Sequence, residues 1–226
     1  GERVAVVNGE PRGSLITVPE DGRVPAFTSA ARDWLREATQ SNRQFGAYDN
    51  PENRPLAERC IVSFGSSAGP PMLPNYWYNN NYTIVQNGDH VMILAEMVHD
   101  VRIIRLGEQN PLPRHLKPYF GDSWGHWEGN TLVVETKNIH PDHIFRGVPQ
   151  SIEGTIIERF TLVSEDQILY EFTISDPVNY TEIWGGQLPF NRFDDQVLEY
   201  SCHEGNYALE GVLRGARFQE IGGGVN

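Results

Sequence analysis

The chain has 226 residues, of which 39% are hydrophobic and 21% are charged. This balance is typical of one globular domain with a substantial core. Lys and Arg number 18 against 30 Asp and Glu, so the formal net charge is −12. Because nucleic-acid affinity comes largely from basic side chains that neutralise phosphates, we expect no nucleic-acid partner. The same charge disfavours an anionic membrane surface.

No apolar run approaches the roughly 20 residues that a helix needs to cross a bilayer, so we expect no membrane insertion. The sequence also does not begin with the basic and then apolar pattern of a signal peptide. This is weak support for a cytoplasmic location, because a mature form whose leader has been removed would look the same.

The first part of the chain predicts one helix. Residues 1–27 lack a periodic pattern and are expected to be irregular or weakly extended. Residues 28–40 predict a helix, because Thr28 or Ser29 can cap its start and apolar side chains share one face. That face consists of Ala31, Trp34, Leu35 and Ala38.

From residue 82 onward the sequence predicts strands joined by short turns. The strongest hairpin signal is Asn87-Gly88 between two apolar segments, because these residues tolerate the positive φ angles of a type I′ turn. Further turns are expected at residues 128–130 and 164–167, and the last strands at 181–193 and 196–202.

The expected fold is all-β: an antiparallel meander of about seven to nine strands that closes into a small barrel, because long sheets usually curl to remove their edges. A strongly bent half-barrel is the alternative. The absence of strand–helix alternation argues against a parallel α/β sheet. We expect one domain, 1–226, with an N-terminal irregular segment and helix (1–60), a β-barrel (75–205) and a C-terminal tail (206–226).

The two cysteines, Cys60 and Cys202, lie far apart and lack the close spacing of zinc or thioredoxin motifs. One disulfide between them would pin the N-terminal segment to the last strand in an oxidising compartment. Two buried free thiols are the alternative, and the sequence leaves both open.

Familiar signatures of nucleotide binding, serine hydrolysis and zinc proteases are absent from the sequence. Histidines and carboxylates instead occur together in or beside predicted strands. A histidine near a carboxylate can act as a general base, because its proton affinity lies near neutral pH. The candidate catalytic residues are His99, Asp122, His126, Glu128, His203 and Glu204.

Residues 97–102 place polar groups on both faces of a predicted strand. Alternation puts His99 on one face and Asp100 with Arg102 on the other. Asp100 and Arg102 are expected to pair, either as a structural ion pair or as an anchor for a ligand carboxylate or hydroxyl.

Aromatic side chains provide candidate stacking surfaces in two segments. Trp124 and Trp127 could stack on a sugar or an aromatic ring, although we expect Trp127 to lie in the core. Tyr76, Trp77 and Tyr78 stand among asparagines, a composition that suits carbohydrate or phenolic recognition. Packing of this segment across a barrel end is the competing explanation.

A metal site is not expected. His99, His126 and His203 come from three strand regions, as the ligands of barrel metal sites do, but no short spacing supports such a site. The segment from His140 to His143 is a lesser candidate and is expected to be a solvent loop. We expect no cofactor.

Six motifs resemble a large family of β-rich bacterial proteins that are often exported. They are PLAERC (55–60), YNNN (78–81), EMVHDVR (96–102), GDSWGHWEGNTLVVET (121–136), ERF (158–160) and YSCHEGNY (200–207). The resemblance covers about residues 50–217 and departs at Asn130, where the family tends to have Asp. It implies a calycin- or lipocalin-like barrel and a periplasmic or secreted protein, with the cytoplasm left open. The resemblance assigns no catalytic role to any residue.

Three hypotheses for the function follow. The first is a cofactor-independent lyase, isomerase or hydrolase that acts on a small glycoside-like, phenolic or terpenoid compound in the barrel mouth. His203 or His99 would be its base. Asp122, Glu128 or Glu204 would orient the base or return the proton, and Arg102 would stabilise developing negative charge. The second is a calycin-like carrier of a hydrophobic small molecule, without turnover. The third is an interaction protein that exposes its aromatic cluster to a partner chain; a homo-oligomer is left open.

Overall fold

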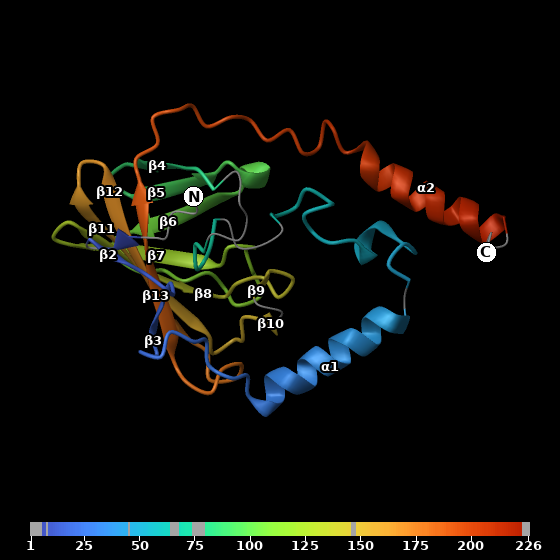
Figure 1. The fold of residues 1–226 in the computed structure, drawn as a ribbon, viewed down its shortest axis with the longest axis horizontal. Coiled ribbons are helices and arrows are strands. Elements are labelled where there is room, and N and C mark those ends of the chain that lie inside the picture. The colour runs from blue at the N-terminus through green and yellow to red at the C-terminus, as the bar shows by residue number, and fades with distance from the viewer. Residues whose placement is uncertain are drawn as a thin grey trace.

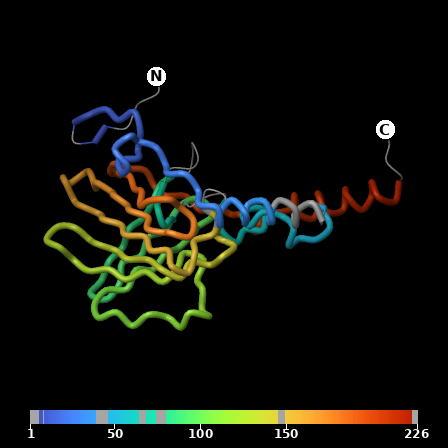
Figure 2. The backbone as a smooth tube through the Cα atoms, turned by 90° about the horizontal axis from the view of Figure 1, so that it is seen from below, coloured from blue at the N-terminus to red at the C-terminus, as the bar shows by residue number. Residues whose placement is uncertain are grey.

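The computed structural model describes residues 6–7, 9–44, 46–63, 68–73, 80–145 and 148–222, without the side chains of 39–44, 145 and 148. In this part of the chain, one large sheet is accompanied by two helices that project away from it on the same side (Figures 1 and 2). None of the described helices is long and apolar enough to cross a membrane.

The large sheet has nine strands in the spatial order β3-β13-β12-β11-β8-β7-β6-β5-β4. Their bounds are β3 Ile16–Val18, β4 Tyr82–Gln86, β5 His90–Ala95, β6 Val101–Leu106, β7 Asp122–Glu128, β8 Thr131–Lys137, β11 Thr155–Ser164, β12 Gln167–Ser175 and β13 Trp184–Asn191. Two separate pairs are β1 (Val6–Val7) with β2 (Glu10–Pro11), and β9 (Ile144–Phe145) with β10 (Val148–Pro149). The helices are α1 (Ser29–Gln44) and α2 (Tyr207–Ile221), with short 3-10 turns η1 (Pro51–Asn53) and η2 (Met97–His99).

The all-β prediction is confirmed, but the sheet is open rather than closed into a barrel. Its edge strands β3 and β4 stand at opposite ends of the strand order and do not pair with each other in the described part of the chain. The antiparallel meander is also interrupted, because β6 and β7 run parallel. Parallel neighbours need a crossover connection, and residues 107–121 provide it.

The β4–β5 hairpin turns at the predicted position but with a different geometry. Gly88 is not among the residues with positive φ, so the turn is not of type I′. The Asn87 side chain instead accepts hydrogen bonds at Oδ1 from the backbone N–H groups of Asp89 (2.9 Å) and His90 (2.8 Å). The asparagine therefore makes this turn through its side chain rather than through a left-handed backbone.

The predicted first helix is confirmed as α1. Thr28 caps it, because its hydroxyl oxygen accepts a hydrogen bond from the N–H of Ala31 (3.2 Å). Ala31 is fully buried, and Trp34, Leu35 and Ala38 are half-buried on the same side. The apolar stripe thus faces the protein, as its spacing predicts.

Two predictions for the C-terminal region are wrong. Residues 196–202 are irregular rather than a strand, and α2 occupies most of the expected tail. Asn206 caps α2 by accepting a hydrogen bond from the N–H of Leu209 (3.4 Å). Gly211 and Gly215 lower the intrinsic helix propensity of this segment, which explains why the sequence pattern did not indicate a helix.

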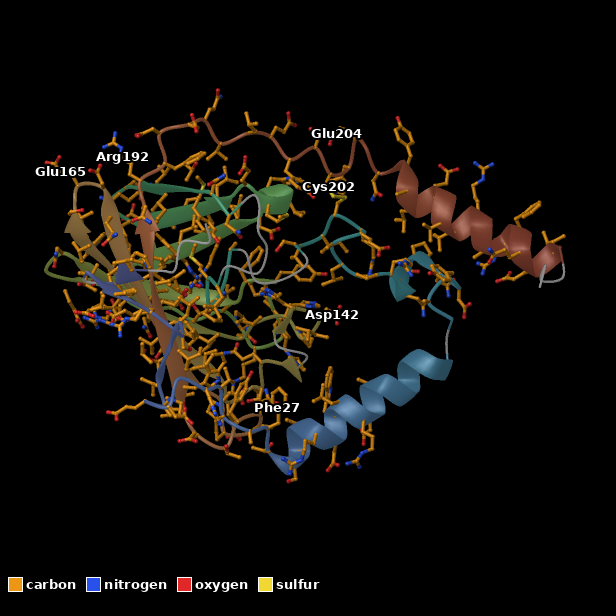
Figure 3. The ribbon with its side chains drawn as sticks, viewed as in Figure 1. Phe27, Asp142, Glu165, Arg192, Cys202 and Glu204 are labelled. Carbon is orange, nitrogen blue, oxygen red and sulfur yellow. A yellow bond between two sulfur atoms is a disulfide. The ribbon has the colours of Figure 1, made fainter. Side chains whose placement is uncertain are left out.

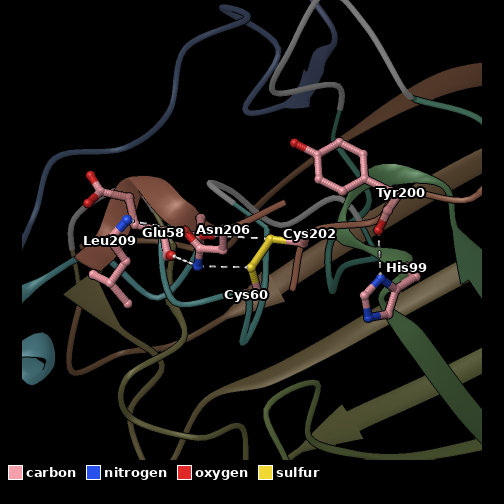
Figure 4. Close-up of a disulfide and its surroundings, with 8 residues drawn as sticks. Glu58, Cys60, His99, Tyr200, Cys202, Asn206 and Leu209 are labelled. Atoms are coloured by element: carbon pink, nitrogen blue, oxygen red, sulfur yellow. Dashed lines mark hydrogen bonds between the residues drawn. A yellow bond between two sulfur atoms is a disulfide. The ribbon is translucent and has the colours of Figure 1, made fainter. Parts of the chain in front are cut away.

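A disulfide joins Cys60 to Cys202 across 142 residues of sequence (Figure 4). Beside it, the Asn206 amide donates a hydrogen bond to the backbone carbonyl of Glu58 (2.8 Å). The bond therefore ties the segment between α1 and β4 to the segment between β13 and α2.

A charged pair, Arg102 with Glu158, lies in the core, and the two side chains are 1% and 0% exposed. The Arg102 guanidinium donates to both carboxylate oxygens of Glu158, and also to the hydroxyls of Thr136 (2.9 Å) and Ser123 (3.2 Å). The hydroxyl of Tyr170 donates to the same carboxylate (2.7 Å). The cost of burying these charges is offset by hydrogen bonds on both partners.

The segment 68–72 is buried against this network. The N–H of Met72 donates a hydrogen bond to the hydroxyl oxygen of Tyr170 (2.7 Å). Met72 also belongs to the hydrophobic core, together with Ile93, Ile104 and Trp184. The buried ion pair thus anchors a loop that fills part of the core face of the sheet.

The Arg102–Glu158 pair predicts a large energetic coupling. Arg102→Met should lower the free energy of unfolding by about 3–5 kcal/mol, because it leaves a buried carboxylate without its cation. Adding Glu158→Gln removes that charge, so the double variant should lose at least about 1 kcal/mol less than the sum of the single losses.

Chemical denaturation of the unmodified protein, Arg102→Met, Glu158→Gln and the double variant measures this coupling. The exposed pair Arg214–Glu210, at 3.0 Å, is the matched control, and its coupling should stay below about 0.5 kcal/mol. Additive losses at Arg102 and Glu158 would contradict the structural role of the pair.

We expect the disulfide to stabilise the C-terminal segment more than the sheet. Replacing both cysteines by serine should lower the free energy of unfolding by about 2–5 kcal/mol, since the bond closes a long loop. Amide hydrogen exchange should speed up more at residues 198–209 than in β11 and β12, because the bond fixes the C-terminal segment. Uniform acceleration across the sheet would show that the bond does not act locally.

Candidate functional site

A cleft of about 1070 Å³ opens between edge strand β4 and the ends of β12 and β13. Its apolar lining includes Met72, Tyr82, Ile168, Leu188 and Phe190. All five belong to the hydrophobic core or pack against it. The cleft therefore reaches from solvent to the core at the side where the sheet does not close.

Aromatic rings form the floor of the cleft. Tyr82 on β4 stacks on Phe190 on β13 with ring centroids 5.5 Å apart, and Phe190 stacks on Tyr170 at 5.1 Å. These strands are not hydrogen-bonded neighbours, so side chains rather than backbone connect them here. Burial raises the pKa of Tyr82 to about 12, so its phenol stays protonated at neutral pH.

The rim of the cleft is polar. The Gln167 amide donates a hydrogen bond to Asn191 Oδ1 (2.8 Å), and the Asn81 amide donates to Glu96 Oε2 (2.6 Å). Charged side chains also reach the rim, and Glu165 and Arg192 stand at the same end of the sheet (Figure 3).

A second hollow, of about 30 Å³, lies beside His143. The prediction of a solvent loop is wrong for this residue, which is 6% exposed. Its Nδ1 lies 2.6 Å from the carbonyl oxygen of Tyr119, and its Nε2 has no hydrogen-bond partner in the described part of the chain. Burial lowers the pKa of His143, so the ring is neutral with Nδ1 donating. A space of this size suits about one water molecule.

The three candidate histidines do not all lie together. His99 and His203 approach each other, with ring centroids 6.4 Å apart, and both are exposed. His126 lies elsewhere, because β6 and β7 pair in parallel with Ile104 opposite Ser123. This register puts His99 before the start of β6 and His126 just beyond the other end of the paired region, six strand positions, roughly 20 Å, from the level of Val101.

The candidate acids also lie apart from one another. Asp122 is buried, where it pairs with Arg105 and accepts a hydrogen bond from the N–H of Leu112 (2.7 Å). Glu128 is exposed, and hydrogen bonds from Arg159 (2.8 Å) and His126 (3.2 Å) lower its pKa. Glu204 is exposed on the segment before α2 (Figure 3). None of the three lines the cleft.

The predicted pairing of Asp100 with Arg102 is wrong. Residues 97–99 form the turn η2, in which Val98 and His99 have φ angles of 58° and 50°, so the strand begins only at Val101. The Asp100 carboxylate accepts a hydrogen bond from the N–H of Ser63 (3.0 Å), while Arg102 pairs with Glu158. The left-handed turn aims the two side chains at different partners. His99 Nδ1 lies 3.1 Å from the carbonyl oxygen of Tyr200 (Figure 4).

The tryptophans differ from the expectation as well. Trp127 is 49% exposed, so its assignment to the core is wrong. It lies near the tip of the β7–β8 hairpin, opposite Leu132 on β8. Trp124 is half-buried below the guanidinium of Arg105, at 4.3 Å from the ring centroid. Trp184, which the sequence did not single out, is fully buried. Tyr76, Trp77 and Tyr78 lie outside the described residues.

The comparisons with known proteins give no match, whether with family models, curated proteins or solved structures. Among the described side chains, no three or more His, Cys, Asp or Glu gather as a metal site requires. The function is therefore inferred from the cleft itself.

Asp100 predicts a pH-dependent contribution to stability. Burial, opposed by hydrogen bonds from Ser63, raises the pKa of Asp100 from 3.8 to about 6. Because the folded-state pKa is the higher one, the contribution is fully present below about pH 4 and is lost as the pH rises through 6.

Asp100→Asn keeps an acceptor for the N–H of Ser63 but cannot ionise. The free energy of unfolding of this variant, relative to that of the unmodified protein, should therefore rise between pH 4 and pH 7.5 by on the order of 1–3 kcal/mol. Denaturation at several pH values measures the difference, with Asp89→Asn at an exposed position as the control for losing one charge. A difference that is constant with pH would exclude ionisation of a buried Asp100.

Proposed function

We propose that this chain binds one small, largely apolar molecule in the cleft between β4 and the ends of β12 and β13. Small-molecule sites are concave and mostly apolar, with a few polar groups that fix orientation. The cleft has this composition, with Met72, Tyr82 and Phe190 on its floor and the amides of Gln167 and Asn191 at its rim.

The observation that carries the proposal is the stack of Tyr82 on Phe190 at the floor of the cleft. A closed barrel would place hydrogen-bonded strands here. The open sheet leaves aromatic and aliphatic surface within reach of a ligand from solvent, and covering that surface is the favourable term for binding.

The lining favours binding over acid–base chemistry. The described residues that line the cleft include no histidine, and the two candidate bases, His99 and His203, lie outside it. The carboxylates of the lining stand at its exposed rim, where water screens them. The carrier-like function therefore has more support than the lyase, isomerase or hydrolase.

The disulfide supports a periplasmic or secreted location for this function. Such bonds persist in oxidising compartments and are rare in the cytosol. A binding protein outside the cytoplasm agrees with that chemistry.

Titration with the neutral dye N-phenyl-1-naphthylamine tests the proposal. We expect a saturable fluorescence increase with one dye per chain. Ile84→Trp, at a position of the lining on β4 that shares a face with Tyr82, should weaken dye binding at least about tenfold, because the indole occupies the cleft.

Val85→Trp is the matched control, since Val85 lies on the same strand but outside the cleft, and it should leave dye affinity unchanged. Unchanged melting curves would show that both variants fold. Equal affinity of both variants and the unmodified protein, or no saturable binding, would contradict the proposal.

A further inference from the structure

We propose that the cleft selects a positively charged ligand, namely a small, largely apolar molecule that carries an ammonium or similar cationic group. This inference rests on the proposed function, because it names the charge class of the molecule that the same cleft binds.

The charged side chains of the described lining are three carboxylates and one guanidinium. They belong to Glu165, Asp166, Asp195 and Arg192. The carboxylates come from the β11–β12 turn and from the segment after β13, so two separate parts of the chain bring negative charge to one rim.

The guanidinium of Arg192 already has carboxylate neighbours. Its Nη1 lies 3.8 Å from Asp166 Oδ1, and its Nε lies 3.4 Å from Asp194 Oδ1. Its backbone N–H also donates a hydrogen bond to the carbonyl oxygen of Asp166 (2.7 Å). An anionic ligand would have to compete for this cation. Glu165 and Asp195 add negative charge that Arg192 does not neutralise.

The aromatic part of the lining suits the same ligand. Tyr82, Phe190 and Phe193 line the cleft, and Phe193 is 47% exposed between Arg192 and Asp194 in the sequence. The face of an aromatic ring attracts a cation through its quadrupole, and this attraction grows when water is excluded. The phenol of Tyr82, whose pKa is about 12, adds no negative charge of its own.

The long-range field acts in the same direction. The formal net charge of the chain is −12, so a cation is attracted to the protein before it reaches the rim, and an anion is repelled. Because the rim carboxylates are exposed, their contribution should fall as salt shortens the screening length to a few Å.

Three probes with the same ten-carbon chain test the inference: decyltrimethylammonium and decanoate, each below its micelle concentration, and decanol below its solubility limit. Their affinities are measured by displacement of N-phenyl-1-naphthylamine at low ionic strength and pH 7.5. We expect the ammonium probe to bind about tenfold or more tightly than decanoate, with decanol between them. At about 0.5 M salt the three affinities should converge.

Glu165→Gln combined with Asp195→Asn should reduce the preference for the ammonium probe to a small factor without changing the affinity for decanol. The matched control is Glu153→Gln with Glu182→Gln, which removes two exposed carboxylates outside the cleft. This control should keep the preference, because it changes the net charge but not the rim.

The outcomes separate the two proposals. Decanoate binding as tightly as the ammonium probe would overturn the charge selection and leave the binding function standing. A preference that the control variant loses as fully as the rim variant would also overturn it, because net charge alone would then be the cause. No binding of the dye or of any probe would overturn both.

Discussion

The buried ion pair between Arg102 and Glu158 is the interaction on which the rest of the structure depends. It joins β6 to β11. The Glu158 carboxylate also accepts a hydrogen bond from the hydroxyl of Tyr170, and that hydroxyl oxygen accepts one from the N–H of Met72. A chain of hydrogen bonds therefore runs from the centre of the sheet to the loop that fills its core face. Because Met72 also lines the cleft, the charged pair fixes part of the floor of the proposed site.

The open sheet explains where the cleft lies. Backbone hydrogen bonds connect nine strands but not β4 with β13, and the Tyr82–Phe190 stack spans that side instead. Aromatic contacts hold the two strands near each other without requiring a continuous ladder, so surface that a barrel would bury stays accessible. Binding in the cleft then covers apolar area that folding alone has left in contact with water.

Local sequence signals predicted the local structure but did not predict the long-range contacts. The Thr28 cap and the Asn87 turn depend on residues within a few positions, so the sequence indicates both, although not that the Asn87 side chain makes the turn. Alternation placed Arg102 with Asp100 on the face opposite His99, but it could not identify Glu158, 56 residues away, as the partner of Arg102. The cleft joins Tyr82 and Phe190 from opposite ends of the strand series, and no spacing in the sequence brings them together. The candidate histidines His99, His126 and His203 do not form one site, because the parallel pairing of β6 with β7 separates His126 from the other two.

The proposed ligand site is the cleft at the open side of the sheet. Its most direct test is a two-dimensional NMR titration of the ¹⁵N-labelled protein with N-phenyl-1-naphthylamine. We expect the largest amide shift changes at Thr83, Gln167 and Asn191, which line the cleft on three different strands. The largest changes around His99 and His203, with the cleft amides unmoved, would contradict it.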